Sequence, residues 1–120
     1  MRHPEYELQC ACVAWFRLAY RDRLIYHIPN GERRDAITGA RLKRSGVVAG
    51  VPDLCVPYSN GTHTHLYIEL KNGKSGRLSP NQQAIIGELT KGGAAVVVCH
   101  SFEEFREAVD AYFAPMVSKK

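Results

Sequence analysis

The stretch from Gly50 to Lys71 constrains the fold of this 120-residue chain more than any other part of its sequence. Its last six residues, Leu66–Lys71, place leucine or isoleucine at every second position, which predicts a β-strand with one apolar face. Side chains alternate across a strand, so Glu69 and Lys71 point together to the opposite face. Asp53 opens a short apolar segment that can pair with this strand and bring a second carboxylate alongside. Two carboxylates and a lysine at one point predict a site for a hard divalent cation, and such a site suits phosphodiester hydrolysis.

A simpler explanation competes with this one. Charged residues on a half-exposed strand commonly form its solvated face, and a Glu-X-Lys tripeptide is frequent by chance. Here, however, the tripeptide follows Pro52-Asp53 at the start of a strand, and a strongly basic loop precedes both. We therefore favour the metal-site interpretation.

Together these features resemble the PD-(D/E)XK nuclease superfamily and, within it, the virus-type replication-repair nuclease (VRR-NUC) family. The matching residues follow the order that the family uses, from the first helix to about His100. They are Glu5 and Gln9, Pro29-Asn30-Gly31 with Arg33 or Arg34, Gly46 to Leu54, Glu69-Leu70-Lys71, and Leu78-Ser79-Pro80-Asn81-Gln82. The resemblance implies an α/β fold of the restriction-endonuclease type, with a mixed sheet flanked by helices, over one domain spanning residues 1–120.

The resemblance also implies a set of site residues around Mg²⁺ or Mn²⁺. Asp53 and Glu69 would supply carboxylates to the metal, the backbone carbonyl of Leu70 would be a further ligand, and Glu5 would reach the site from the first helix. Lys71 would orient or deprotonate the attacking water, or neutralise charge that develops on the phosphate. The sequence does not separate these two roles of the lysine.

Several polar residues have an alternative structural explanation. Glu5 is also well placed for a helix N-terminus, where an acid is worth about 0.3–1 kcal/mol, and Glu7 competes with it for the role at the site. Gln9 is equally well explained as ordinary helix surface. Gln82 fits a capping box that begins at Ser79, although the family motif places it beside the metal, and Gln83 is the alternative to it.

The charge of the chain is unevenly distributed along the sequence. Lysine and arginine outnumber the acids by 16 to 12, giving a formal net charge of +4. Acidic residues gather in the predicted last helix, whereas basic residues gather before Asp53 and around the predicted site. A one-sided basic surface is typical of a nucleic-acid binder. The residues expected to contact DNA phosphates are Arg33, Arg34, Arg41, Lys43, Arg44 and Lys74.

Hydrophobic periodicity and turn signals predict seven elements in the order α-β-β-β-α-β-α. The first helix buries a stripe of Leu8, Ala11, Cys12, Trp15, Leu18 and Ala19, and the last helix a stripe of Phe102, Phe105, Val109 and Tyr112. Residues 29–44 form a basic connection with at most one helical turn, near residues 40–43. The expected ranges are helix 5–20, strands 24–28, 53–57 and 66–71, a helix from Ser79 to Gly92-Gly93, strand 94–99 of the fully buried type, and a helix capped by Ser101.

Other chemistries fit the sequence less well. Four cysteines, which lack zinc-finger spacing, are expected to be small reduced core residues. His63 and His65 share one face of an extended segment, but two ligands do not make a zinc site. Glycoside hydrolysis by Asp53 and Glu69 needs neither the lysine nor the basic loop. A non-catalytic nucleic-acid-binding domain would not need the three site residues together.

The remaining expectations concern substrate, assembly and location. Standalone proteins that resemble this chain are junction-resolving nucleases, so a four-way (Holliday) DNA junction is the preferred substrate, with flap or fork DNA in repair or replication as the alternative. One metal centre cuts one strand, so a two-fold homodimer is expected to act on both strands. No apolar stretch is long enough for a signal sequence or a membrane span, which favours the cytoplasm of a bacterium or of a phage-infected host.

Overall fold

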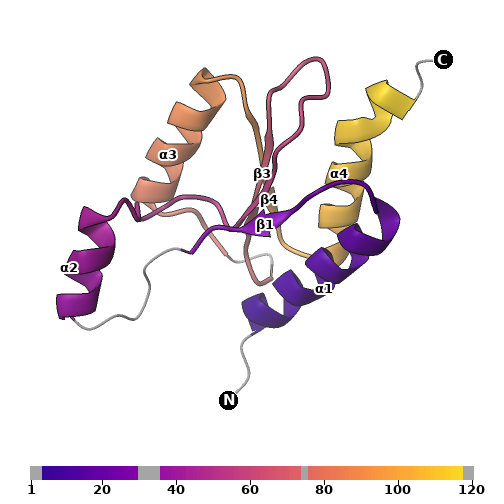
Figure 1. The fold of residues 1–120 in the computed structure, drawn as a ribbon. Coiled ribbons are helices and arrows are strands. Elements are labelled where there is room, and N and C mark those ends of the chain that lie inside the picture. The colour runs from indigo at the N-terminus through magenta and orange to yellow at the C-terminus, as the bar shows by residue number, and fades with distance from the viewer. Residues whose placement is uncertain (1–3, 30–35, 74–75, 118–120) are drawn as a thin grey trace.

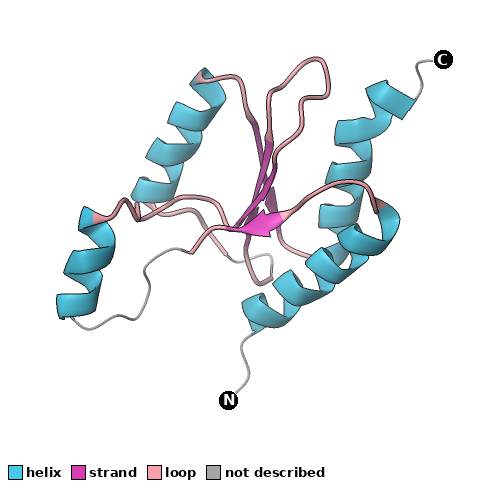
Figure 2. Ribbon diagram, in the orientation of Figure 1, coloured by secondary structure: helices cyan, strands magenta, loops and turns pink. Residues whose placement is uncertain are grey.

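The computed structural model describes residues 4–29, 36–73 and 76–117. Helices lie on both sides of a central sheet, and α2 projects beyond it (Figure 1; Figure 2). Among the described helices, none has the length and apolar character that crossing a bilayer requires. The elements are α1 (Pro4–Ala19), β1 (Tyr26–His27), α2 (Ala36–Arg44), β2 (Leu54–Val56), β3 (Leu66–Leu70), α3 (Pro80–Lys91), β4 (Ala95–Cys99) and α4 (Phe102–Val117).

The four strands form one mixed sheet in the spatial order β1-β2-β3-β4. The first three strands are antiparallel neighbours, and Leu54 lies opposite Ile68. β4 runs parallel to β3, with Glu69 opposite Val98, because the chain crosses over through α3 before it returns to the sheet. A mixed sheet between helices is the fold class that the sequence predicted.

The hydrophobic core lies between the sheet and the pair α1 and α4. Leu66, Ile68 and Leu70 of β3 all point into it and are at most 1% exposed. The predicted alternation of β3 is therefore present. From α4 the core receives Phe105 and Val109, as predicted, and also Phe113, which the predicted stripe omitted.

The predicted stripe of α1 was wrong in part. Cys12 and Phe16 are fully buried, but Leu18 is 76% exposed and Ala11 and Ala19 lie on the surface. The buried line is rotated around the helix because Phe16 stacks on Tyr20 and fills the core. An apolar residue without a partner, such as Leu18, is common on a protein surface.

Helix α2 replaces the basic connection expected before Asp53, so the element order is α-β-α-β-β-α-β-α. It was underestimated because it has no apolar stripe facing the core, and its Ile37 is 69% exposed. It ends in a Schellman motif, in which the N–H of Val47 bonds the carbonyl of Leu42 and the N–H of Gly46 bonds that of Lys43. Gly46 has a φ of +111°, which favours glycine.

Two further expectations need correction. The strand β4 is only half-buried from Ala95 to Val98, because it is an edge strand covered on one side by α3, a helix with no fully buried residue. All four cysteines are free, but Cys10 is exposed, unlike the other three. It lies on the face of α1 that turns away from the core.

Candidate active site

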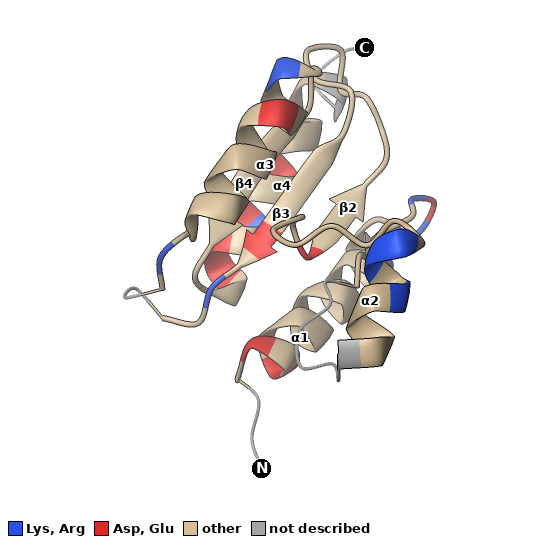
Figure 3. Ribbon diagram, turned by 90° about the vertical axis from the view of Figure 1, so that its left-hand side faces the viewer, with Lys and Arg blue, Asp and Glu red and all other residues tan. Residues whose placement is uncertain are grey.

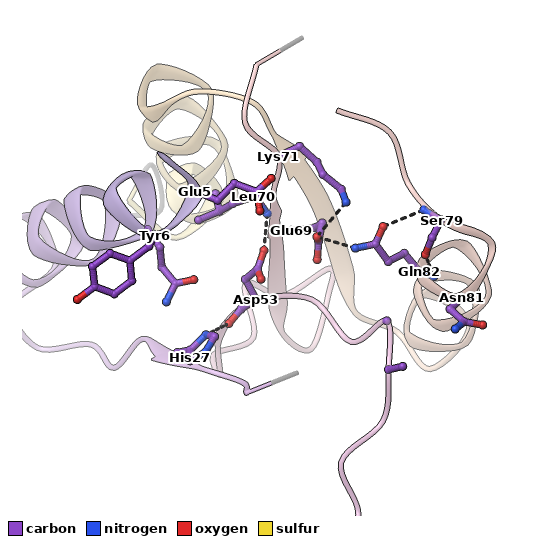
Figure 4. A pocket seen from close by; sticks show the side chains of 13 residues that line it. Glu5, Tyr6, His27, Asp53, Glu69, Leu70, Lys71, Ser79, Asn81 and Gln82 are labelled. Carbon is purple, nitrogen blue, oxygen red and sulfur yellow. Dashed lines mark hydrogen bonds and ion pairs between the residues drawn. The ribbon is translucent and has the colours of Figure 1, made fainter. Parts of the chain in front are cut away.

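A cavity of about 420 Å³ opens at the end of the sheet, between the first turns of α1 and α3. It is lined from one side by Glu5 and Gln9 of α1, and from the other by residues at the start of α3 (Figure 4). Its base is formed by Asp53, just before β2, and by the end of β3. Both helix N-termini carry partial positive charge, which favours anionic groups between them.

Asp53 is fixed by its neighbours on both sides. Its backbone carbonyl accepts the N–H of Ile28 at 2.8 Å, which continues the pairing of β1 with β2. Its carboxylate accepts the backbone N–H of Leu70 at 2.7 Å. Burial raises the pKa of Asp53, and the Leu70 hydrogen bond opposes that change by stabilising the ionised form. The sequence expectation that Asp53 lies beside β3 therefore agrees with the geometry.

Glu69 is buried, with 5% of its surface exposed, although it carries an ionisable carboxyl group. Its Oε2 accepts a hydrogen bond from Gln82 and lies 3.7 Å from Lys71 Nζ, whereas its buried Oε1 has no hydrogen-bond partner among the described residues. Burial, followed by the nearby Asp53 carboxylate, raises the pKa of Glu69 to about 7. A buried carboxylate oxygen without a donor is costly, and a cation would satisfy it.

Lys71 follows the last residue of β3, and its backbone N–H bonds the carbonyl of Cys99 in β4. Its side chain is 17% exposed and runs toward Glu69 on the same face, as the strand alternation predicted. The ammonium group therefore lies at the cavity with its charge directed at the buried carboxylate (Figure 4).

The first turn of α1 brings Glu5 to the cavity, where its carboxylate accepts the backbone N–H of Asn72 at 3.2 Å. Its charge contributes to the raised pKa values of Asp53 and Glu69. Gln9, one helical turn further on, also lines the cavity, whereas Glu7 is not among its lining residues. The geometry thus favours Glu5 over Glu7.

The side chain of Gln82 takes part both in the N-terminal cap of α3 and in a hydrogen bond to Glu69. It completes the predicted capping box of α3, because its Oε1 accepts the N–H of Ser79 at 2.8 Å while the Ser79 hydroxyl accepts the N–H of Gln82. Its Nε2 donates to Glu69 at 2.8 Å. The structural and functional explanations of Gln82 are therefore compatible. Gln83 instead approaches the carbonyl of Leu78, away from Glu69.

Gly50 holds the loop before Asp53 against the start of α3. It is buried, its φ is +95°, and a Cβ at this position would lie 2.9 Å from the backbone carbon and oxygen of Asn81. Only glycine allows this close approach. The contact fixes the distance between the segment that carries Asp53 and the helix that carries Gln82.

The sequence analysis missed His27, which lines the cavity from β1. Its Nδ1 lies 2.9 Å from the Asp53 carbonyl oxygen, an acceptor, so Nδ1 carries the proton. The signal that could have found it is the pairing of β1 with β2, because that pairing brings the end of β1 beside Asp53. Tyr6 lines the cavity as well and had no sequence signal, and so does Asn81, which lies within the matched motif from Leu78 to Gln82.

The predicted DNA-binding residues are only partly within the described chain. Arg41, Lys43 and Arg44 lie in the last turn of α2, where positive charge also stabilises the helix end (Figure 3). All three are exposed. Arg33, Arg34 and Lys74 lie outside the described residues.

A divalent metal fits the donor set. Among the residues that the structure describes, no three His, Cys, Asp or Glu side chains form a closed metal-binding group. Mg²⁺ does not need one, since it is commonly held by one or two carboxylates and keeps several waters. Asp53 and the unpartnered Oε1 of Glu69 supply that kind of open site.

Comparison with known proteins agrees with the fold. The profile of the VRR-NUC domain family matches residues 1–103. A solved structure described as a "VRR_NUC domain protein" superimposes with a TM-score of 0.79 and 26% sequence identity, over 95% of this chain and 91% of that chain. None of the curated proteins matches this chain. The resemblance and the fold class predicted from the sequence are confirmed.

Proposed function

This chain belongs to the VRR-NUC family, and we propose on that basis that it is a divalent-metal-dependent endodeoxyribonuclease of the PD-(D/E)XK type. The observation that supports the proposal best is the buried Glu69 carboxylate, whose Oε1 has no partner among the described residues. Asp53 lies on one side of it and Lys71 on the other, at the base of an open cavity. Burial and the neighbouring Asp53 carboxylate raise the pKa of Glu69 to about 7, and carboxylates perturbed in this way are concentrated at functional sites.

Each site residue has a proposed role. Asp53, Glu69, the carbonyl of Leu70 and Glu5 would hold the metal directly or through water. When bound, Mg²⁺ or Mn²⁺ supplies Lewis-acid activation of the phosphodiester and of water. Gln82 keeps Glu69 oriented through its hydrogen bond to Oε2. This bond holds the carboxylate in one rotamer, with Oε2 toward Gln82 and Lys71.

Lys71 would act on the reacting groups themselves. Its ammonium can orient the attacking water or stabilise negative charge on the phosphate in the transition state. The neighbouring Glu69 carboxylate, 3.7 Å away, keeps the lysine beside the metal site rather than in solvent. Both roles require Lys71 Nζ to reach a phosphate that is bound in the cavity.

The test of this function compares the charged residues of the site, which include the Glu69–Lys71 pair, with an exposed control pair. Asp53→Ala, Glu69→Ala and Lys71→Ala should fold and bind DNA yet lose at least about 10²-fold in cleavage rate, because the first two remove proposed metal ligands and the third removes the ammonium that acts on the reacting groups. The controls are Glu88→Ala and Lys91→Ala, which break an exposed pair on α3 with a similar separation of 3.8 Å. Cleavage by the site variants at the parent rate, or loss in the controls, would contradict the assignment.

We propose that the basic residues of α2 contact DNA phosphates, together with Arg33, Arg34 and Lys74. Replacing Arg41, Lys43 and Arg44 by glutamine should weaken binding and reduce the slope of log K against log salt by about 0.9 for each phosphate that the variant no longer neutralises. Replacing Arg17, Arg21 and Lys91, which are exposed on other surfaces, changes the net charge equally and should leave the slope nearly unchanged. Equal slopes in the two triple variants would rule out α2 as a DNA-binding surface.

We further propose that the substrate is branched DNA, with a four-way junction preferred over flap or fork DNA, and that the protein acts as a homodimer. A two-fold dimer presents two sites to two strands, which a single metal centre cannot cut at once. A panel of linear duplex, flap, fork and four-way junction, each with Mg²⁺, Mn²⁺ or chelator, would rank the substrates. Light scattering would give the mass. A monomer that cuts linear duplex as fast as junctions would refute both parts, and binding without cleavage in either metal would favour a non-catalytic DNA-binding domain.

A further inference from the structure

The chain returns past Lys71 at Gly76 and packs its backbone against the stem of that lysine. A Cβ built on Gly76 would lie 2.8 Å from Lys71 Cβ and 3.5 Å from both Cγ and Cδ. Real Cβ atoms do not approach that closely, and the φ of Gly76 is not positive, so glycine is needed here for space alone. The first half of the lysine side chain therefore packs against this backbone.

His100, which directly follows β4, holds Gly76 in place. Its Nε2 lies 3.3 Å from the carbonyl oxygen of Gly76, and a carbonyl only accepts, so Nε2 is the donor. Glu104 fixes the backbone of His100, because its Oε1 accepts the His100 N–H at 2.7 Å. His100 thus connects the start of α4, through its backbone, to Gly76, through its ring.

We propose that Gly76 and His100 form a clamp that positions Lys71, with neither residue touching the substrate. A lysine has four rotatable bonds, and its ammonium can leave the site by a rotation at any of them. The clamp removes freedom at the first bonds, so the ammonium remains within 3.7 Å of Glu69. Its effect on catalysis rests on the proposed nuclease function, whereas its effect on the order of the lysine does not.

The first experiment compares two glycines of the same segment. In Gly76→Ala the new methyl group must displace the Lys71 stem, and single-turnover cleavage at saturating DNA should fall by about 10²-fold, as expected for a reacting group moved by about 1 Å. Gly73→Ala is the control, because a Cβ there meets no atom within 4 Å although its φ is +75°. The dissociation constant for DNA, measured with chelator, should be the same in both variants and the parent.

A second pair of variants covers the case in which Gly76→Ala does not fold. His100→Ala removes the donor to Gly76 and should slow cleavage, whereas His100→Gln restores an N–H donor and should recover most of the rate. In a Lys71→Ala background, His100→Ala should cause no further loss, since the clamp has nothing left to position. Additive losses from the two substitutions would overturn the proposal.

A direct measurement separates the clamp from the function. NMR order parameters of the Lys71 side-chain methylenes in the metal-free protein should be high in the parent and in Gly73→Ala, and lower in Gly76→Ala and His100→Ala. Unchanged lysine order would overturn the clamp even if cleavage falls. An absence of cleavage in every protein, with the predicted change in order, would overturn the nuclease proposal and leave the clamp supported.

Discussion

The two faces of the sheet are built from the same strands but differ in burial and in charge. Toward α1 and α4, β3 presents Leu66, Ile68 and Leu70, which are sealed from water. Toward α3 it presents Tyr67 and Glu69, and α3 itself has no fully buried residue. One face holds the protein together and the other carries unsatisfied charge. Because strand side chains alternate, five consecutive residues can serve both purposes.

The comparison also shows what permits the second face to exist. A buried carboxylate with an unpartnered oxygen destabilises a fold, and such groups persist where surrounding structure compensates for them. Here the compensation comes from the core face, which packs Phe16, Phe105 and Phe113 at 0% exposure. Stability and site chemistry are thus separated by the thickness of one sheet. Substitutions on the two faces should therefore have different consequences.

The largest effect on stability is expected on the core face. Phe105→Ala should lower the free energy of unfolding by about 3–5 kcal/mol, because it removes a fully buried ring and leaves a cavity. Ile85→Ala, on the half-buried side of α3, should cost only about 1 kcal/mol. Urea denaturation measures both values. Similar losses in the two variants would show that the faces contribute equally and would break the comparison.

A smaller effect is expected where the loop before Asp53 meets α3. Gly50→Ala and Gly46→Ala both place a side chain at positive φ, at a cost of about 1–2 kcal/mol each. Only Gly50→Ala adds a clash with backbone, since a Cβ on Gly46 meets no atom within 4 Å. Gly50→Ala should therefore be the less stable variant and should also lose cleavage activity. Equal stability and activity would mean that α3 shifts freely to accommodate the methyl group.

The site face should also give the metal-free protein a specific pH dependence. The pKa of Glu69 rises from 4.5 in the unfolded chain to about 7 in the folded protein, so the folded form binds more protons between these values. Its contribution to the free energy of unfolding therefore decreases as pH increases from about 4.5 to about 7 and is constant above. Glu69→Gln should lack this contribution, and the difference between its stability and that of the parent, measured by urea denaturation across this range, isolates it. A difference that does not vary with pH would contradict the raised pKa.

The smallest effect on stability is expected at the start of α3. Gln82→Ala removes half of the capping box and should cost about 0.5–1 kcal/mol, while also releasing Glu69 and slowing cleavage. Gln83→Ala, one residue further along, should leave both quantities nearly unchanged. Thermal unfolding and single-turnover cleavage test the pair. Loss of activity in Gln83→Ala alone would assign the site role to the other glutamine.

Local patterns predicted the parts of the structure that depend on neighbours in sequence. The alternation in Leu66–Lys71 predicted the strand and the common direction of Glu69 and Lys71, and Ser79 marked the start of α3. The full length of helix α2 was not predicted, because the helix buries no apolar stripe. Its sequence therefore lacks the helical spacing of apolar residues. The contact of His27 with Asp53 depends on the pairing of β1 with β2, and the contact of Gly76 with Lys71 depends on how the chain returns past the lysine. Residue type and spacing alone do not specify either contact.

The side-chain amide of Gln82, which bonds both Ser79 and Glu69, restricts the substitutions that this position tolerates. A capping box ordinarily accepts either glutamate or glutamine at its third residue, so one base change is usually neutral there. Here the same amide donates to Glu69 Oε2, and a glutamate would instead set two carboxylates against each other. Substitution of Gln82 by glutamate is therefore not neutral as long as Glu69 is retained. Natural relatives that carry glutamate at this position should also carry a different residue in place of Glu69.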